Sequence, residues 1–187
     1  MRKIINSTFI TLDGVVETPH LWPSLGSSAT DISLKIQTEL LDSCDALIMG
    51  RRTYDSFAAA WPARAGDNFA DRLNSMRKYV ASTTLRDPHW TNTTVIADDL
   101  IGVIQRLKQQ PGLDILQYGL GPVSFAMLEN GLLDELRLWV YPLILGRTGP
   151  RAPHFLDAPP IRMRLVDSRS LVNGICVHRY EVDRATA

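Results

Sequence analysis

The chain has 187 residues, of which 45% are hydrophobic, so it is long enough to bury a substantial core and falls within the size of one domain. Basic and acidic residues balance at 20 each, which gives no overall positive field for nucleic acid or an anionic membrane surface. No apolar stretch reaches the roughly 18 residues that a membrane helix needs, and the start of the chain shows no continuous apolar leader, so we expect one cytoplasmic domain over residues 1–187.

The first predicted elements are a strand and a helix. Residues 3–11 are rich in Ile, Thr and Phe, which favours a strand, and the pair Asp13-Gly14 directly after it supplies turn chemistry. Apolar residues then recur at helical spacing over residues 30–41, beside charged and polar ones. Thr30 or Asp31 would cap this amphipathic helix at its N-terminus.

The middle of the chain continues the alternation of strands and helices. The apolar run 46–49, closed by Gly50, is typical of a strand that is buried on both faces of a sheet. The elements that follow are a helix opening at Arg51, strands at 78–82 and 93–97, a helix at 98–110, a strand at 114–118 and a helix from Pro122 to Leu128.

The end of the chain changes pattern. A strand is predicted at 136–143, and strands at 163–171 and 175–182 flank Asn173-Gly174, a pair that favours the tight turn of a β-hairpin. Alternating strands and helices followed by this hairpin indicate an α/β fold. We expect a mixed, mostly parallel sheet with flanking helices and a C-terminal antiparallel hairpin.

The segment Gly50-Arg51-Arg52-Thr53 is a candidate phosphate site. It follows a buried strand and opens a helix, and the first turn of a helix presents unpaired N–H groups with partial positive charge. Arg51 and Arg52 would add charge. The alternative is that both arginines are simply solvated side chains at a helix start.

Two more strand ends offer hydrogen-bond donors. Gly119-Leu120-Gly121 lies between a strand and a helix and lets the backbone approach a pyrophosphate, although it lacks the third glycine of a dinucleotide-binding fingerprint and also suits a plain tight turn. Ser82 and Thr83 end another strand, where they either donate to phosphate or form a turn. In an open α/β sheet the three ends would converge at the carboxyl edge, the usual position of a nucleotide crevice.

These segments together resemble a known family. Residues 49–57, residues 78–82 and Gly119-x-Gly121 are similar in order and spacing to dihydrofolate reductase. Asp13-Gly14, and the run from Gly131-Leu132-Leu133-Asp134-Glu135-Leu136 to Pro142-Leu143-Ile144-Leu145-Gly146, more closely resemble the reductase domain of the bifunctional riboflavin-biosynthesis deaminase-reductase. The resemblance extends from Lys3 to about Val182 and implies a dihydrofolate-reductase-like fold.

The resemblance also implies NADPH as the cofactor. Arg51 would contact the 2'-phosphate, with Ser82 and Thr83 alongside and Arg52 assisting or substituting, since a guanidinium fork suits phosphate oxygens. Thr53 would lie under the pyrophosphate. The implied cofactor-binding residues are Gly50, Arg51, Arg52, Thr53, Ser82, Thr83, Gly119, Leu120, Gly121, Pro122 and Val123.

The substrate side follows the family less closely. Leu34 stands where dihydrofolate reductase has the acidic residue that binds the pterin, and Asp31 lies nearly one helical turn earlier, as a shifted carboxylate. Substrates of the riboflavin branch carry a ribityl or ribosyl phosphate, for which Arg147 and Arg151 are scattered loop candidates. Folate is therefore a doubtful substrate.

The remaining candidates each have two interpretations. Asp13 is the most plausible polar residue near the nicotinamide, and thus the catalytic candidate, but Asp-Gly is first of all a turn former. Trp22 and Trp61 are either aromatic platforms for the substrate or packing residues, and the same choice applies to Tyr54. The histidines and the two cysteines show no metal-ligand spacing, so we expect no metal site.

The sequence therefore predicts an NADPH-dependent oxidoreductase that transfers a hydride to a small heterocyclic or carbonyl-like molecule. By resemblance it is a homodimer built through the C-terminal strands, with Leu138, Val140 and Val177 in the interface. The main alternative is a nucleotide-binding module that has kept the fold and lost turnover. A purely structural domain without a cofactor is a third hypothesis.

Overall fold

A computed structural model describes residues 1–26, 30–64, 66–146 and 160–183, with only the backbone described at Thr30 and Asp31. The strands are β1 Ile4–Thr11, β2 Cys44–Gly50, β3 Arg77–Ala81, β4 Thr93–Ile96, β5 Asp114–Tyr118, β6 Glu135–Tyr141, β7 Met163–Ser170 and β8 Cys176–Val182. The helices are the 3-10 turn η1 Pro19–Leu21 and the α-helices α1 Thr30–Asp42, α2 Arg51–Ala60, α3 Asn68–Ser75, α4 Leu100–Gln109 and α5 Pro122–Glu129.

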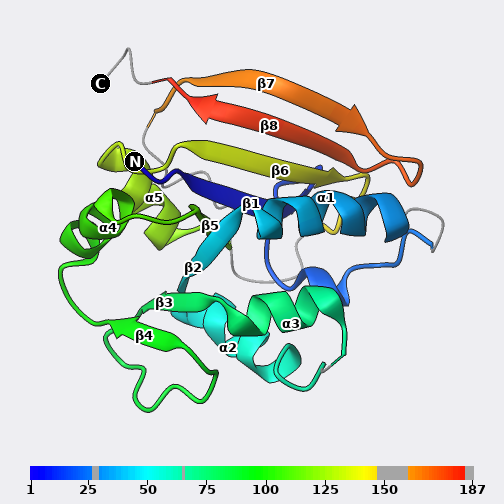
Figure 1. Cartoon of the computed structure of the whole chain (residues 1–187). Coiled ribbons are helices and arrows are strands. Elements are labelled where there is room, and N and C mark those ends of the chain that lie inside the picture. The colour runs from blue at the N-terminus through cyan, green and yellow to red at the C-terminus, as the bar shows by residue number, and fades with distance from the viewer. Residues whose placement is uncertain (27–29, 65, 147–159, 184–187) are drawn as a thin grey trace.

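All eight described strands form one sheet, in the order β4-β3-β2-β5-β1-β6-β8-β7 (Figure 1). The six strands from β4 to β6 are parallel to their neighbours, whereas β8 is antiparallel to both β6 and β7. The predicted mixed, mostly parallel sheet with a C-terminal antiparallel hairpin is confirmed. The last parallel strand ends at Tyr141, earlier than expected, because the Leu143 N–H donates to the Tyr141 carbonyl at 2.7 Å in a tight turn that interrupts the regular ladder.

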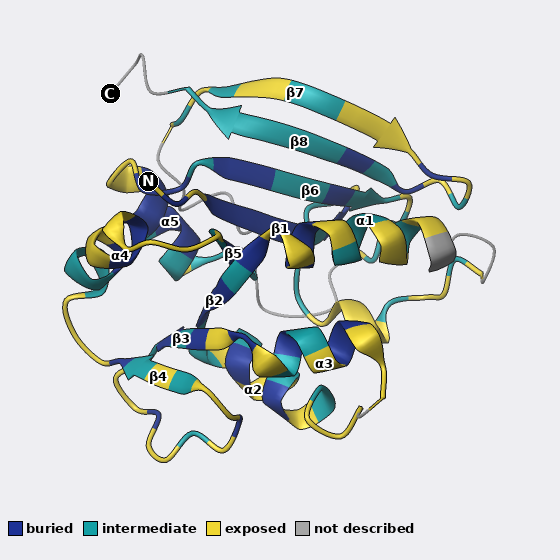
Figure 2. Ribbon diagram, in the orientation of Figure 1, coloured by how far each residue is buried: buried dark blue, intermediate teal, exposed yellow. Residues whose placement is uncertain are grey.

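Strand β2 shows why the sheet needs helices on both faces. Its side chains alternate, so Leu47 and Met49 pack in a cluster with α1, α2 and α3, while Ala46 and Ile48 pack in a second cluster with α4 and α5. Figure 1 shows α4 and α5 on one side of the sheet and α1 and α3 on the other. The central strands are accordingly the most buried part of the ribbon (Figure 2).

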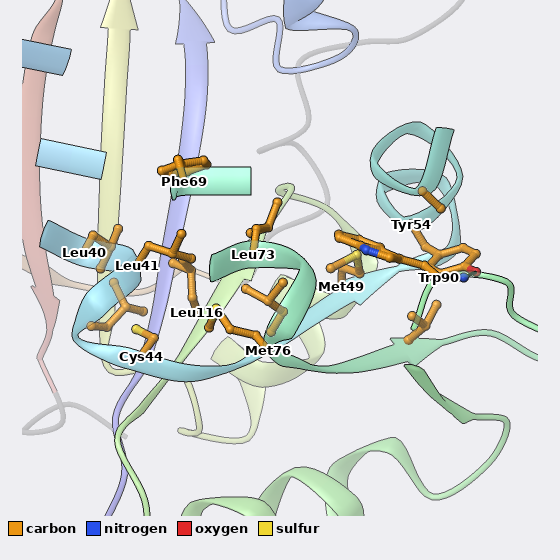
Figure 3. Close-up of a cluster of buried hydrophobic side chains, with 14 of the residues drawn as sticks. Leu40, Leu41, Cys44, Met49, Tyr54, Phe69, Leu73, Met76, Trp90 and Leu116 are labelled. Carbon is orange, nitrogen blue, oxygen red and sulfur yellow. Dashed lines mark hydrogen bonds between the residues drawn. The ribbon is translucent and has the colours of Figure 1, made fainter. Parts of the chain in front are cut away.

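Helix α3 was not predicted from the sequence. Asp67 caps it by accepting from the N–H groups of Phe69 and Ala70 at 2.9 and 3.4 Å, and its apolar face brings Phe69 and Leu73 into the first cluster (Figure 3). The helix has eight residues, so it shows too few helical repeats for a periodicity signal. The Asp67 cap was the available signal.

The third cluster joins β6 to the C-terminal hairpin and to α1. Trp139, Leu171, Ile175 and Val177 are buried together there, with Ile36 of α1 packed against them. Val177 is only 6% exposed within the single chain, so its side chain has little surface to offer a second copy. The dimer through the strands around Leu138, Val140 and Val177 stays a prediction, with Val177 itself packed in this cluster.

None of the helices in the described ranges is long and apolar enough to cross a membrane.

Lys78, in β3, is a fully buried cation. Its ammonium donates to the carbonyls of Asn74, Met76 and Thr91 at 2.7, 2.8 and 3.1 Å and lies 4.5 Å from the centre of the Trp90 ring. Burial lowers the pKa of Lys78 from 10.5 to about 8, because removal from water disfavours the charged form. The ammonium thus joins the end of α3 to the loop before β4, but desolvation of the buried charge costs free energy.

This cost predicts a specific dependence of stability on pH. Between pH 8 and pH 10.5 the unfolded chain binds more protons at Lys78 than the folded chain, so stability rises with pH in this window. We expect the free energy of unfolding of the wild type, relative to Lys78→Met, to increase by about 2–3 kcal/mol across it. Urea unfolding of both proteins at the two ends measures this, and parallel pH profiles would contradict it.

Candidate functional site

The three strand ends singled out in the sequence lie next to one another in the sheet. Strands β3, β2 and β5 are neighbours and run parallel, with Gly50 opposite Ala81 and Ile48 opposite Gln117. The chain leaves these strands toward Ser82, Arg51 and Gly119 respectively, all at the same edge. The predicted convergence at the carboxyl edge is therefore confirmed by the register.

The N-termini of α2 and α5 meet at this edge. A Cβ atom added to Gly119 would lie 2.5 Å from the Thr53 Oγ1, and one added to Gly50 would lie 3.5 Å from a Val123 methyl group. Gly119 also has a φ of +84°, which a residue with a side chain rarely adopts. Gly50 is the N-cap of α2, and no side-chain hydrogen bond caps this helix start. Because Gly50 lies close to Val123 of α5, the positive dipole ends of the two helices lie side by side.

A buried set of polar side chains holds the glycine turn in place. We call Asn6, Thr8, Gln117 and Ser124 the amide network; each of them is at most 4% exposed. The Asn6 amide donates to the Gly119 carbonyl at 2.9 Å and to the Gln117 Oε1 at 2.8 Å, and Thr8 donates to the Asn6 Oδ1 at 2.8 Å. The turn therefore rests on β1 as well as on its own strand β5.

Ser124 closes the amide network from the side of α5. Its hydroxyl donates to the Gly119 carbonyl at 3.1 Å, and it accepts from the Gln117 amide at 2.8 Å and from the Gly121 N–H at 3.3 Å. Sequence reasoning missed this network. The available signal was a polar residue, Asn6 or Gln117, inside an otherwise apolar strand pattern.

The two arginines at the start of α2 point to different partners. The Arg51 Nε donates to both carboxylate oxygens of Asp55 at 2.8 and 2.9 Å, one helical turn away. Arg52 donates to the Glu17 carboxylate at 3.1 Å and so contacts the loop that follows β1. Because Gly50 pairs with Ala81, Arg51 begins beside Ser82, whereas the Arg52 side chain lies against a different segment.

The end of β3 forms a tight polar turn. The Ser82 hydroxyl accepts from the N–H groups of Thr84 and Leu85 at 3.2 and 3.0 Å, and Thr83 is exposed. Arg86 donates to the carbonyls of Thr83 and Leu85 at 3.1 and 3.0 Å, so it adds a cation that sequence reasoning missed. Its position four residues after Ser82 in a loop gave no periodic signal.

The Asp13 side chain stabilises the turn after β1 by hydrogen bonds. Its carboxylate accepts from the Thr11 hydroxyl at 2.5 Å and from the N–H groups of Leu145 and Gly146, the shorter of these at 2.9 Å. The hydrogen bond from Thr11, supported by those backbone N–H groups, lowers the pKa of Asp13 below its usual value of 3.8. A carboxylate held ionised in this way favours the turn interpretation over a proton-donating one.

Trp22 and Leu34, two of the substrate candidates, line a single pocket of about 320 Å³. Its walls come from the loop after η1, from α1, from the end of β6 at Tyr141 and from the β7–β8 turn at Asn173. We call it the tryptophan pocket. Asp31 lies in the first turn of α1, but its side chain is outside the described part of the structure, as are Arg147 and Arg151.

Tyr54 and Trp61 do not line this pocket. Tyr54 is 1% exposed, and its hydroxyl accepts from the Trp90 N–H at 3.3 Å (Figure 3). Trp61 packs against Phe57 and Phe69, with ring centres 6.1 and 5.5 Å apart. Tyr54 is therefore corrected from a substrate candidate to a packing residue, because α2 buries it in the first core cluster; Trp61, directly after α2, is partly buried and packs against the same cluster.

Within the described ranges, no group of three His, Cys, Asp or Glu side chains is arranged to hold a metal ion.

One family model covers nearly the whole chain. The model of the RibD C-terminal domain family matches residues 2–177. An uncharacterized protein from Bacillus subtilis (strain 168), YyaP, is 27% identical over 179 residues, which cover 93% of this chain and 92% of that protein.

Solved structures share the fold at low sequence identity. A putative riboflavin biosynthesis protein from Shewanella sp. PV-4 superposes with a TM-score of 0.69 at 21% identity, covering 98% of this chain and all of that one. A pyrimidine reductase-like protein from Corynebacterium diphtheriae gives 0.61 at 15% identity, with coverages of 98% and 92%. RibD from Acinetobacter baumannii gives 0.66 at 18% identity, but this chain, 98% covered, spans only 59% of it.

The contact between Gly119 and Thr53 predicts an energetic coupling. Gly119→Ala forces an alanine into positive φ, at about 1–2 kcal/mol, and drives its Cβ into the Thr53 hydroxyl, at about 1–3 kcal/mol more. In a Thr53→Ala background only the first cost remains. Urea unfolding of the four proteins measures this difference.

Gly121→Ala is the matched control in the same turn. Gly121 has an extended φ of 170°, and nothing lies within 4 Å of an added Cβ, so we expect a change of at most about 0.5 kcal/mol. Equal losses at Gly119 and Gly121, or a Gly119→Ala loss independent of Thr53, would contradict the close approach of the two helix starts.

Proposed function

The chain belongs to the RibD C-terminal domain family, and from this membership we propose that it is an NADPH-dependent reductase that transfers a hydride to a small heterocyclic or carbonyl-like molecule. Names of fold relatives support a reductase. One from Corynebacterium diphtheriae is called pyrimidine reductase-like. One from Thermotoga maritima, which superposes with a TM-score of 0.65 at 14% identity and of which this chain spans 57%, is called a diaminohydroxyphosphoribosylaminopyrimidine deaminase/5-amino-6-(5-phosphoribosylamino)uracil reductase.

The observation that carries the proposal is the meeting of two helix starts at neighbouring strand ends. Each supplies backbone N–H groups and a positive dipole end, and together they suit the two phosphates of a dinucleotide. Gly119 lets the turn approach Thr53 closely, and the open space at Gly121 leaves the backbone accessible. We assign the pyrophosphate of NADPH to Thr53 and to the turn from Gly119 to Val123.

The 2'-phosphate is assigned to the neighbouring end of β3. Arg51 begins beside Ser82, and Arg86 is bonded to the carbonyl of Thr83, so two guanidinium groups and two hydroxyl groups belong to this corner. An arginine fork donates two parallel hydrogen bonds to phosphate oxygens. Arg52, which pairs with Glu17, is assigned to support of the loop after β1 rather than to direct phosphate contact.

When bound, NADPH would supply the hydride, so no protein nucleophile is required. The chain would bind and orient the cofactor along the carboxyl edge and position the substrate in the tryptophan pocket. Asp13 would hold the loop at Leu145 and Gly146 in place beside the nicotinamide end. Its ionised state assigns the proton of the reaction to water or to another group.

A second candidate function is a cofactor-binding module without turnover. It is favoured by Leu34, which is 46% exposed at the tryptophan pocket where a dihydrofolate reductase has a carboxylate. The two functions separate in one assay. Oxidation of NADPH in the presence of reducible pterins, flavin precursors or quinones supports the reductase, whereas tight binding without oxidation across such a panel supports the module.

Assembly and location remain proposals. We propose a cytoplasmic homodimer built through the C-terminal strands, because β7 is the last strand of the sheet and Leu138 and Val140 of β6 are only partly buried. Light scattering at micromolar concentration should give twice the chain mass. A monomer at that concentration would contradict the dimer and leave the proposed reaction unaffected.

The cofactor assignment predicts a selective loss in Arg51→Ala. We expect calorimetry to show that the wild type binds NADPH more tightly than NADH, and that Arg51→Ala loses about 1.5–3 kcal/mol of NADPH binding, the range for a hydrogen bond to a charged group. NADH binding should change little, because NADH has no 2'-phosphate.

Arg77→Ala is the matched control, since Arg77 is an exposed arginine at the opposite, amino end of β3. It should bind both cofactors like the wild type. Absence of NADPH binding in the wild type would contradict the reductase and the module alike, and an equal loss of NADPH and NADH in Arg51→Ala would remove Arg51 from the 2'-phosphate site.

A further inference from the structure

A second hollow lies on the face of the sheet that carries α1. It has a volume of about 250 Å³ and is formed by the C-terminal half of α1 and by the strands β6, β8 and β7. We call it the arginine hollow, because Arg137, Arg169 and Arg179 line it. Its volume is just below the roughly 300–1,000 Å³ of pockets for drug-sized molecules, so it suits a small ligand.

The arginine hollow is separate from the tryptophan pocket, and the two share no lining residue. Arg137, Trp139 and Tyr141 alternate onto one face of β6, with Arg137 at the hollow and Tyr141 at the tryptophan pocket. Trp139, between them, is 0% exposed and belongs to the third core cluster. A ligand in the hollow would therefore leave the site proposed for the substrate free.

Two arginines of the hollow lie directly opposite each other on neighbouring strands. Arg137 of β6 pairs in register with Arg179 of β8, and like charges in this arrangement repel. The Arg137 Nε donates to the Glu135 carboxylate at 2.6 Å. Arg179 has no side-chain hydrogen bond or ion pair with any described residue, and its Nε is buried. A bound carboxylate would relieve this, because a guanidinium donates two parallel hydrogen bonds to it.

The two acidic residues of the lining differ in their partners. Asp167 is already paired, since its carboxylate accepts from the Arg169 Nε at 2.9 Å. Glu39 is exposed on α1 and has no ion pair with any described residue. Among the described residues, the hollow thus presents one unpaired cation on β8 and one unpaired anion on α1.

The rest of the lining is mostly aliphatic. Ile36 and Leu40 of α1 and Val177 of β8 line the hollow, and such side chains accept a short hydrocarbon group. Ser43, directly after α1, completes the lining. Its hydroxyl donates to the Leu40 carbonyl at 2.7 Å, so this carbonyl at the end of the helix is already satisfied.

We infer that the arginine hollow binds a small zwitterion, an aliphatic amino acid, with its carboxylate on Arg179 and its ammonium on Glu39. The unpaired cation, the unpaired anion and the aliphatic side chains match the three parts of such a molecule. A simple anion would be repelled by Glu39, and a simple cation would be repelled by Arg179. The inference is independent of the proposed reductase, since it uses none of the residues assigned to the cofactor or the substrate.

Three molecules with the same hydrocarbon group test the two charges separately in the full chain. Valine carries both charges, isovalerate lacks the ammonium, and isobutylamine lacks the carboxylate. NMR titration of the isotope-labelled protein should show valine binding, with each analogue weaker by roughly tenfold or more, as expected for the loss of a charged hydrogen bond. The signals that shift should include Val177. Absence of valine binding, an analogue that binds as tightly as valine, or shifts confined to the tryptophan pocket would overturn the inference.

Variants assign each charge to its residue. Arg179→Gln should weaken valine to the level of isobutylamine, and Glu39→Gln should weaken it to the level of isovalerate. Urea unfolding checks that both variants stay folded, which we expect because neither side chain has an ion-pair partner among the described residues.

Arg164→Gln is the matched control, since Arg164 of β7 pairs with Glu181 outside the hollow and its side chain is 66% exposed. It should bind valine like the wild type. An equal loss of valine binding in Arg164→Gln and Arg179→Gln, or unchanged binding in Arg179→Gln or Glu39→Gln, would contradict the assigned site.

Discussion

The candidate site depends on one constraint, the fixed position of the Gly119 carbonyl. The Asn6 amide and the Ser124 hydroxyl both donate to it, and Gln117 joins these two side chains across the buried centre of the sheet. Buried polar groups are tolerated only when they are satisfied, and satisfied networks define one arrangement. Here that arrangement sets the glycine turn against Thr53, so the two helix starts that would face a dinucleotide depend on residues that never reach the surface.

The sheet could be predicted from the sequence because glycine, proline and asparagine residues mark the ends of several strands. Strand β5 was expected at its observed bounds, since Pro111-Gly112 precedes it and Gly119 follows. The hairpin was predicted from Asn173-Gly174. Helix α3 was missed because eight residues give too short a pattern, and the end of β6 was misplaced because the apolar pattern continues to Leu143, past the tight turn that interrupts the ladder after Tyr141.

The site was predicted in its backbone and less well in its side chains. Glycines and helix starts at strand ends are positioned by topology, so Gly50, Thr53 and Gly119 were brought together as expected. Which side chain an arginine pairs with depends on the tertiary fold, and the spacing of residues along the sequence does not reveal it. Hence the separation of Arg51 toward Asp55 and Arg52 toward Glu17, and the burial of Tyr54, became visible only in the structure.

Glu17 connects the two halves of the carboxyl edge. Its carboxylate accepts from Arg52 at the start of α2, while its backbone carbonyl accepts from Trp22, the aromatic wall of the pocket. The half proposed to bind phosphate is built from helix starts and arginines, whereas the described lining of the pocket half consists of aromatic, aliphatic and uncharged polar side chains. In the proposed reaction a hydride would pass between cofactor and substrate at near-contact distance, which requires the two halves to keep a fixed relative position. The loop after β1, tied to α2 by one group of Glu17 and to the pocket by another, supplies that position.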